Sequence, residues 1–259
     1  MAAQRKLSFV SITLILLLVG LIGFGISEFT GKSANIDEEE FGSRVRGYLL
    51  ANPQVLREVI DELSVQEKAA AEAEMRAQIA TLEDELKNDP NSFVAGNPDG
   101  DITIVEFFDY RCGYCKRSFP DIMKVVTEDG NIRLVLKEFP ILGEDSVLAS
   151  RAAIASLAQD RYMDFHTALM QTRGGLTKER ILSIAKETGI DTDKLLSDMN
   201  SEKVRSIITA NYAAARQLGV NGTPAFVIGT TFVPGAIKAE ELANLVAEAR
   251  QKAATKATN

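Results

Sequence analysis

Two cysteines three positions apart, Cys112 and Cys115, mark the point in this sequence where an extended segment gives way to a helix. Residues 102–108, just before them, form a short run of β-branched and aromatic side chains that predicts a buried strand. After the cysteines, apolar residues recur at helical spacing, at Ile122, Met123, Val125 and Val126. A buried strand that turns directly into a helix is a unit of an α/β domain, so this feature constrains the fold most.

The position of Cys112 also has a chemical meaning. Unpaired backbone N–H groups and the positive end of the helix dipole stabilise an anion at a helix N-terminus. A thiolate is such an anion, and cysteines placed this way in C-x-x-C motifs reach pKa values of about 3.5–7.5, against about 8.5 for a free cysteine. Cys115 lies one turn further in, and we expect it to be more buried. There it can attack a mixed disulfide formed at Cys112.

The chain has only these two cysteines and one histidine, His166. A structural disulfide framework needs more cysteines at wider spacing. A tetrahedral zinc site needs four ligands and would have to be shared between chains. We therefore expect a redox pair that needs no cofactor beyond its own Cys112–Cys115 disulfide. The alternative is an exported metal-handling or chaperone-like protein whose two thiols bind a soft ion such as Cu(I).

Charge argues against a nucleic-acid partner. The formal net charge is -7, and residues 1–36 carry three basic side chains against one acidic one, which leaves -9 for the remainder. The sequence shows no basic stripe with interleaved aromatic residues, so nucleic acid is excluded as a main partner.

The first 36 residues read as a targeting segment. Arg5 and Lys6 precede an uncharged run of 21 residues, 7–27, which is long enough to span a bilayer core as a helix. We favour an inner-membrane anchor over a cleaved signal peptide because the run is long and no A-x-A-like exit follows it. In either case the positive end stays inside, and the remaining chain is expected in the periplasm.

Residues 37–92 are predicted to form a helical stalk. Acidic residues favour a helix start at 37–40, and Asn52 with Pro53 suits the cap and first turn of a second helix. Further on, apolar residues follow at steps of four, three and four, at Met75, Ile79, Leu82 and Leu86. This spacing favours a short coiled-coil seam, and hence a homo-oligomer through residues 37–88. The alternative is a helix folded back onto its own domain.

Residues 93–254 are predicted to form one α/β domain, with a flexible tail at 255–259. A second strand at 132–139 gives a strand–helix–strand order, which implies a parallel pair. Residues 144–218 are helical in pattern throughout and read as an insertion. The sheet then resumes with a hairpin of two segments, and an amphipathic helix closes the domain.

These features together resemble the DsbA family of thioredoxin-fold thiol–disulfide oxidoreductases. The resemblance rests on the sequence Cys112-Gly113-Tyr114-Cys115, on Pro120 within the following helix, and on Gly222-Thr223-Pro224-Ala225-Phe226 before a late strand. It implies a thioredoxin-like fold with a helical insertion. The helical segment ahead of the domain is similar to that of ScsC or Com1-type proteins, some of which resemble trimeric disulfide isomerases.

The resemblance also implies roles for several residues. Pro224 falls on the family's cis-proline, and the backbone of Thr223 would pair with an extended substrate, although Thr223 also suits an ordinary turn. Glu106 and Lys137 each interrupt an apolar strand, and the family's buried acid and lysine move the proton of the buried thiol. We expect them to meet beneath Cys115; the alternative places Lys137 at a strand end with its head in water.

The remaining expectations concern Gly113, Tyr114, Tyr110 and His166. Gly113 and Tyr114 occupy the place of the family's redox dipeptide, where the best-known oxidases carry a histidine. Tyr114 and Tyr110 suit either a peptide-contact surface or the core. His166 lies within the insertion, and we expect it to be structural because no acid–base partner is evident.

The expected function is thiol–disulfide exchange with protein substrates, with Cys112 as the attacking cysteine and Cys115 as the resolving one. A membrane redox partner would supply or remove electrons. The sequence leaves the direction open between disulfide oxidase and isomerase or reductase.

Overall fold

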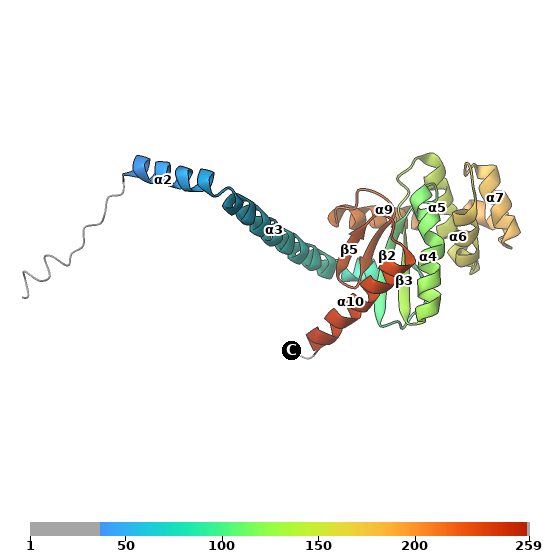
Figure 1. Cartoon of the computed structure of the whole chain (residues 1–259). Helices are drawn as coiled ribbons and strands as arrows, with labels where there is room; N and C mark the ends of the chain where they lie inside the picture. Colours follow the sequence, from blue (N-terminus) through green and yellow to red (C-terminus); the bar gives the residue numbers. More distant parts are fainter. Residues whose placement is uncertain (1–36, 258–259) are drawn as a thin grey trace, which may run out of the picture. The chain divides into compact units, whose positions relative to one another are not determined.

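The computed structural model describes residues 37–257 and divides the chain into two units, up to Val65 and from Gln66 onward. In the first unit, helix α2 spans Glu38–Ala51 and helix α3 begins at Gln54 (Figure 1). The Asp37 side chain caps α2 by accepting the N–H of Glu39 at 3.1 Å.

The expected first helix is therefore confirmed, but the role predicted for Asn52 is wrong. Its side-chain amide donates to the Tyr48 carbonyl at 2.9 Å, so Asn52 closes α2 instead of opening α3. Helix α3 itself runs Gln54–Thr81 and starts one residue after Pro53.

The first unit exposes many large apolar side chains. In α2 and the first part of α3 they are Phe41, Val45, Tyr48, Leu50, Leu56, Val59, Ile60, Leu63 and Val65. We call this set the exposed apolar face of residues 41–65. Soluble proteins rarely expose so many large apolar side chains close together. Where they do, the exposed apolar surface marks a site of interaction with another molecule.

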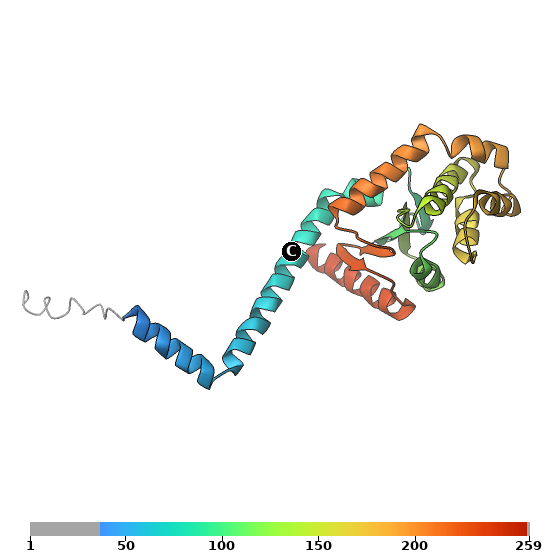
Figure 2. The same cartoon turned by 90° about the horizontal axis from the view of Figure 1, so that it is seen from above.

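The second unit is built on a mixed five-stranded sheet (Figures 1 and 2). The strand order is β1-β3-β2-β4-β5, and only the β2–β3 pair is parallel. The strands are β1 Phe93–Gly96, β2 Ile102–Phe108, β3 Ile132–Glu138, β4 Ala225–Ile228 and β5 Thr231–Pro234. The parallel pair and the late hairpin agree with the sequence-based prediction. Strand β1, which pairs with β3 at the edge, was not predicted.

Side chains alternate across this sheet, so each face has its own core. One face carries Ile104 and Phe108 of β2 and packs against helices α4 Gly113–Asp129 and α10 Ala239–Ala257 and against the insertion. The other face carries Val105 and Phe107. It packs against the end of α3, the short π-helical segment η1 Asp84–Asn88 and helix α9 Glu202–Gln217.

The packing on the face that carries Val105 and Phe107 shows that the predicted coiled-coil seam is wrong. Ile79, Leu82 and Leu86 are buried against Val105 and Phe107, and Met75 packs at the edge of the same cluster. These residues belong to the core of their own domain, so the stalk does not extend to residue 88 and the domain begins well before residue 93. Apolar residues at steps of three and four suit a helix that packs on a sheet as well as a helix that packs on another helix.

The predicted helical insertion is confirmed. Its elements are α5 Glu144–Ser156, η2 Leu157–Gln159, α6 Tyr162–Gln171, α7 Lys178–Glu187, α8 Thr192–Asp198 and α9. Side-chain oxygens cap three of these helices: Thr177 caps α7, Asp191 caps α8 and Ser201 caps α9.

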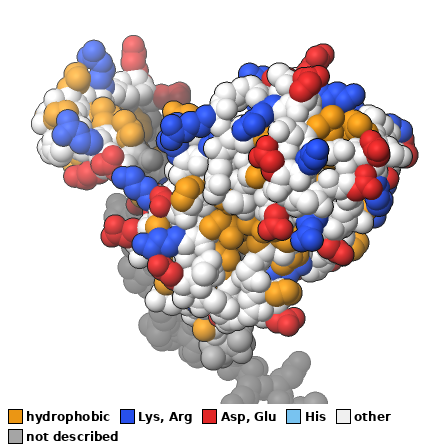
Figure 3. Space-filling model, turned by 90° about the vertical axis from the view of Figure 1, so that its right-hand side faces the viewer, with side chains coloured by type: hydrophobic (Ala, Val, Ile, Leu, Met, Phe, Trp, Pro, Cys, Tyr) orange, Lys and Arg blue, Asp and Glu red, His pale blue; other side chains and the backbone are white. Residues whose placement is uncertain are grey.

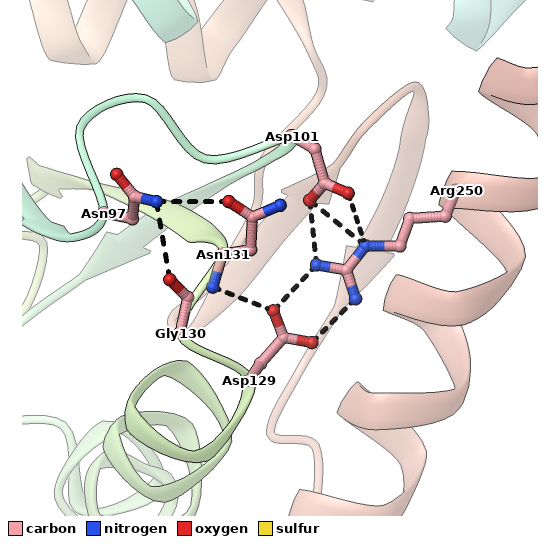
Figure 4. Close-up of polar contacts among 6 residues, drawn as sticks. All are labelled: Asn97, Asp101, Asp129, Gly130, Asn131 and Arg250. Carbon is pink, nitrogen blue, oxygen red and sulfur yellow. Dashed lines mark hydrogen bonds and ion pairs between the residues drawn. The ribbon is translucent and has the colours of Figure 1, made fainter.

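Helix α10 is fixed to the sheet end by one arginine (Figure 4). The Arg250 guanidinium forms two-pronged contacts with Asp101 and Asp129, with N–O distances of 2.7–3.1 Å. The helix continues to Ala257, so the flexible tail predicted from residue 255 is wrong for 255–257.

Charges of both signs are interspersed on the face shown in Figure 3, around a hydrophobic area near its centre. Within residues 37–257, no helix is both long and apolar enough to cross a membrane. The anchor or signal segment expected at residues 1–36 lies outside the described residues.

The packing of residues 75–86 can be tested with a matched pair of substitutions. Leu86→Ala removes a fully buried side chain, and we expect the free energy of unfolding to fall by about 2–5 kcal/mol. Leu56→Ala makes the same change at a side chain that is 48% exposed, and the domain should unfold at nearly the wild-type denaturant concentration. Equal shifts in urea denaturation for the two variants would contradict this packing.

Candidate active site

Cys112 is the N-cap residue of α4, where the chain leaves β2 and turns into the helix. Its backbone N–H donates to the Asp109 carbonyl at 3.0 Å, and its sulfur accepts the N–H of Cys115 at 3.5 Å. Both cysteines are free thiols in this structure, and Cys112 is 6% exposed while Cys115 is fully buried. The predicted position at a helix N-terminus and the predicted difference in burial are both confirmed.

A second segment approaches the same sulfur from the far end of the sequence. The Thr223–Pro224 peptide bond is cis, as predicted, and it leads into β4. The Cys112 thiol donates to the Thr223 carbonyl at 3.1 Å. The fold thus brings together two loops that lie 111 positions apart in the sequence.

These contacts give the two thiols very different acidities. The hydrogen bond with the Cys115 side chain is the largest influence on Cys112, ahead of burial, which acts in the opposite direction. A hydrogen bond with the Thr223 side chain and bonds from the backbone N–H groups of Tyr114 and Cys115 favour the thiolate, and the pKa of Cys112 falls to about 5. Burial, together with the bond to Cys112, raises the pKa of Cys115 far above its ordinary value. At neutral pH, Cys112 is the thiolate and Cys115 carries the proton.

Glu106 lies on the same face of the sheet as the cysteines and is 1% exposed. Its Oε1 atom has no hydrogen-bond partner within the described residues. Burial, and after it the negative charge of Cys112, raises the pKa of Glu106 to about 8. Glu106 and Cys115 also interact electrostatically. This carboxyl group can therefore hold or release a proton close to the buried thiol.

Lys137 does not join Glu106, and this part of the prediction is wrong. In the β2–β3 register Lys137 lies opposite Phe107, whereas Glu106 lies opposite Leu136. Neighbouring positions of a strand face opposite sides of the sheet, so the two side chains are separated by the sheet. The strand-end alternative is also wrong, because Lys137 is only 1% exposed and its Nζ pairs with Asp89 Oδ2 at 2.7 Å.

That ion pair explains how the domain buries a lysine. Burial lowers the pKa of Lys137. Burial alone would raise the pKa of Asp89, but hydrogen bonds from Lys137 and Asn91 lower it overall. The buried cation is thus matched by an anion from the segment that follows η1.

Asp109 is a positioning residue that the sequence analysis did not single out. Its carboxylate accepts the N–H of Arg111 at 2.7 Å, the hydroxyl of Ser146 at 2.8 Å and the N–H of Leu142 at 3.0 Å. These bonds tie the cysteine turn to the start of the insertion. An Asp that bonds the N–H two residues on is the signature of an Asx-turn, so the sequence did carry a signal.

A second buried network links the cysteine turn to helix α6. Tyr110 donates to Glu138 at 3.1 Å, Tyr162 donates to the same oxygen at 2.8 Å, and Tyr110 contacts His166 Nδ1 at 2.9 Å. Burial lowers the pKa of His166 to about 3, so the ring is neutral. The structural role expected for His166 agrees with this geometry, but its partner Tyr110 and the buried Glu138 were missed.

The two tyrosines near the cysteines occupy different environments. Tyr110 is fully buried, whereas Tyr114 is 61% exposed, with the Arg117 guanidinium 4.4 Å from the centre of its ring. Gly113, beside it, is exposed as well. Of the two, only Tyr114 is therefore accessible to a partner molecule.

Comparison with known proteins agrees with this site. Residues 103–247 match the family model of the DSBA-like thioredoxin domain, and residues 37–70 match that of the copper resistance protein ScsC N-terminal domain. The first match covers more than half of the chain. This chain therefore belongs to the DsbA-like thioredoxin-domain family, a class of thiol–disulfide oxidoreductases.

Two solved structures illustrate the similarity. A thioredoxin-like oxidoreductase from Silicibacter pomeroyi is 46% identical, with a TM-score of 0.64, and the match covers 65% of this chain and 97% of that one. Proteus mirabilis ScsC in a transitional conformation is 32% identical, with a TM-score of 0.63, over 83% of this chain and 97% of that one.

A curated relative, the probable disulfide bond formation protein D of Bacillus anthracis, is 27% identical over 146 residues. The match covers 51% of this chain and 67% of that protein. Another curated relative is much longer than this chain, and the match covers only 24% of that relative's length.

The origin of the low Cys112 pKa can be tested at Cys115. Cys115→Ala removes the side-chain hydrogen bond, and we expect the pKa of Cys112 to rise from about 5 toward that of a free cysteine. Cys115→Ser retains a hydroxyl donor and should raise it less. The ultraviolet absorbance of the thiolate, followed against pH, measures both variants. The explanation fails if Cys115→Ala titrates as the wild type does.

Proposed function

We propose that the whole protein is a periplasmic thiol–disulfide oxidoreductase that acts on disulfide-bonded protein clients, and that it works mainly as an isomerase or reductase. The observation that carries the proposal is the Cys112 sulfur at the N-terminus of α4, 3.1 Å from the Thr223 carbonyl. A thiolate at a helix N-terminus, close to the backbone of the loop that leads into β4, suits attack on an extended client.

The exchange needs no cofactor other than the cysteine pair. The Cys112 thiolate attacks one sulfur of a client disulfide, the client S–S bond breaks, and one client thiolate leaves. Cys115, once its proton has been removed, attacks the Cys112 sulfur of the mixed disulfide. The Cys112–Cys115 bond forms, the second client thiolate leaves, and the client has gained the two electrons that the pair has lost. In isomerisation a client thiolate displaces Cys112 instead, and no net oxidation occurs.

Glu106 is the proposed acceptor of the Cys115 proton. Its pKa of about 8 lies close to neutral pH, as an acid–base group requires. Lys137 has no part in this transfer, since it lies on the other face of the sheet.

Client binding is assigned to the loops around Cys112. The Thr223 backbone lies beside the sulfur, the cis bond to Pro224 fixes its direction, and the exposed Gly113 and Tyr114 offer an adjoining surface. An extended peptide would pair with this backbone in the manner of an added strand.

The preference for isomerase or reductase work rests on the first unit. Its exposed apolar face suits self-association, and residues 37–70 match the ScsC N-terminal domain model. Several cysteine pairs held together can act on one client at a high effective concentration. Such an enzyme must be kept reduced, so a membrane redox partner is expected to supply electrons. The uncharged run at 7–27 supports export.

Single cysteine variants test the exchange. Cys112→Ser should abolish insulin reduction because no thiolate remains to attack. Cys115→Ser should accumulate mixed disulfides with clients, visible on non-reducing gels, because the resolving thiol is gone. The variant lacking both cysteines should trap none. Wild-type insulin reduction by Cys112→Ser would refute the proposal.

Two glutamates on the apolar face test the assembly. Val59→Glu with Leu63→Glu places charges among the exposed apolar residues, and we expect smaller assemblies in sedimentation velocity and a lower rate of scrambled-ribonuclease refolding. Reduction of a small disulfide should persist because the catalytic residues are untouched.

Gln54→Glu with Ser64→Glu adds the same two negative charges at exposed polar positions of the same helix and serves as the control. Sedimentation of the wild-type chain as a monomer would remove the argument for isomerisation.

A further inference from the structure

A small cavity is formed by the turn before α4, the first turn of α4 and the loop between α6 and α7. Its volume is about 330 Å³, and it is lined by Arg111, Lys116, Thr172, Arg173, Gly174 and Gly175. We call it the basic pocket. Arg111 directly precedes Cys112, and Lys116 lies one helical turn after it, with its N–H donating to the Cys112 carbonyl.

The Lys116 ammonium group fixes the pocket wall. It donates to the carbonyls of Leu169 and Thr172, each at 2.7 Å, at the C-terminal end of α6. These carbonyls form the negative end of the helix, so the lysine neutralises it where it meets the pocket. An ammonium group has three N–H donors, and two are used here.

Further donors are unpaired. Within the described residues, the N–H groups of Arg173, Gly174 and Gly175 donate to no protein acceptor, and the Arg173 guanidinium forms no ion pair. Gly174 has a φ of +87°, a conformation that a side chain would disfavour. The loop thus exposes consecutive backbone donors beside a free cation.

Two carboxylates of the protein lie near enough to compete with a bound anion for the basic side chains of the pocket. Asp145 Oδ2 is 4.0 Å from Arg111 Nε, a loose contact between exposed groups. The buried Asp109 carboxylate already accepts hydrogen bonds from Arg111, Leu142 and Ser146. Three cationic side chains against these two acids leave the pocket with a net positive charge.

We propose that the basic pocket is a carboxylate-binding subsite for the disulfide substrate. The inference rests on the proposed exchange activity and adds a specificity to it. Arg173, the free backbone donors of its loop and Arg111 bind the carboxylate, and Lys116 holds the loop against α4. Arg111 and Lys116 flank Cys112 in the sequence, so we assign the carboxylate to the molecule whose sulfur Cys112 attacks. Arginine forks suit carboxylates, and charge near a reactive group raises the rate of productive encounter.

The test compares small disulfides of different charge on the full, reduced chain. The probes are dithiodipropionate, with two carboxylates, and bis(2-hydroxyethyl) disulfide, which is neutral. In each reaction the Cys112–Cys115 dithiol is oxidised and the probe is reduced to two thiols. For Arg173→Ala we expect the ratio of anionic to neutral second-order rate constants to fall by about threefold at low salt, as for one half-exposed ion pair.

Arg216→Ala removes the same charge from an exposed position on α9 and should leave the ratio as in the wild type. Arg173→Lys should restore part of it. A second arm uses disulfide-linked peptides with Glu or Gln beside cysteine. A loss confined to the small probe assigns the subsite to small acidic thiols, and a loss with the Glu peptide as well assigns it to acidic clients.

A ratio that stays unchanged in Arg173→Ala, or that falls equally in Arg216→Ala, would overturn the subsite. That result is distinct from failure of the proposed function, in which the neutral probe itself would not be reduced by the wild type, or would be reduced equally well by Cys112→Ser.

Discussion

The contact of the Cys112 sulfur with two separate backbone segments is the interaction on which the rest of this structure depends. One segment is the first turn of α4, and the other is the loop that carries Thr223. They meet because β2 and β4 are hydrogen-bonded neighbours in the sheet. The packing of the buried sheet faces therefore fixes the positions of both loops. Small displacements of either loop would break the hydrogen bonds to the Cys112 sulfur.

The asymmetry between the two thiols follows from the same arrangement. Cys112 gains hydrogen bonds that favour its charged form, whereas Cys115 lies in the core, where a charge is costly. A buried carboxyl group, Glu106, stands near them without a hydrogen-bond partner for one oxygen among the described residues. An unpaired buried acid destabilises a fold and is typical of functional sites, which supports the role proposed for Glu106 as acceptor of the Cys115 proton.

Much of this could be read from the sequence, and the failures have identifiable causes. The strand before Cys112, the helix after it and the helical insertion were predicted because their patterns are local. Residues 75–86 were assigned to a coiled coil because helical spacing does not tell which surface a helix covers. The pairing of Glu106 with Lys137 failed through strand register, since a difference of one position sends side chains to opposite faces. Strand β1 is too short to show a pattern of its own.

The N-terminal segment has two physically distinct parts, although its sequence is helical throughout. From Met75 onward its apolar residues complete the second face of the sheet, and Asp89 supplies the charge that allows Lys137 to be buried. Removing either partner would leave an uncompensated buried charge, so this part is inseparable from the catalytic domain. Before Val65 the same kind of residue is exposed and has no such partner among the described residues. Selection for domain stability accounts for the first part but not for the second. Apolar side chains kept on an exposed helix are explained by association with another molecule, and this is why we place the assembly surface at residues 41–65 and not at the predicted seam.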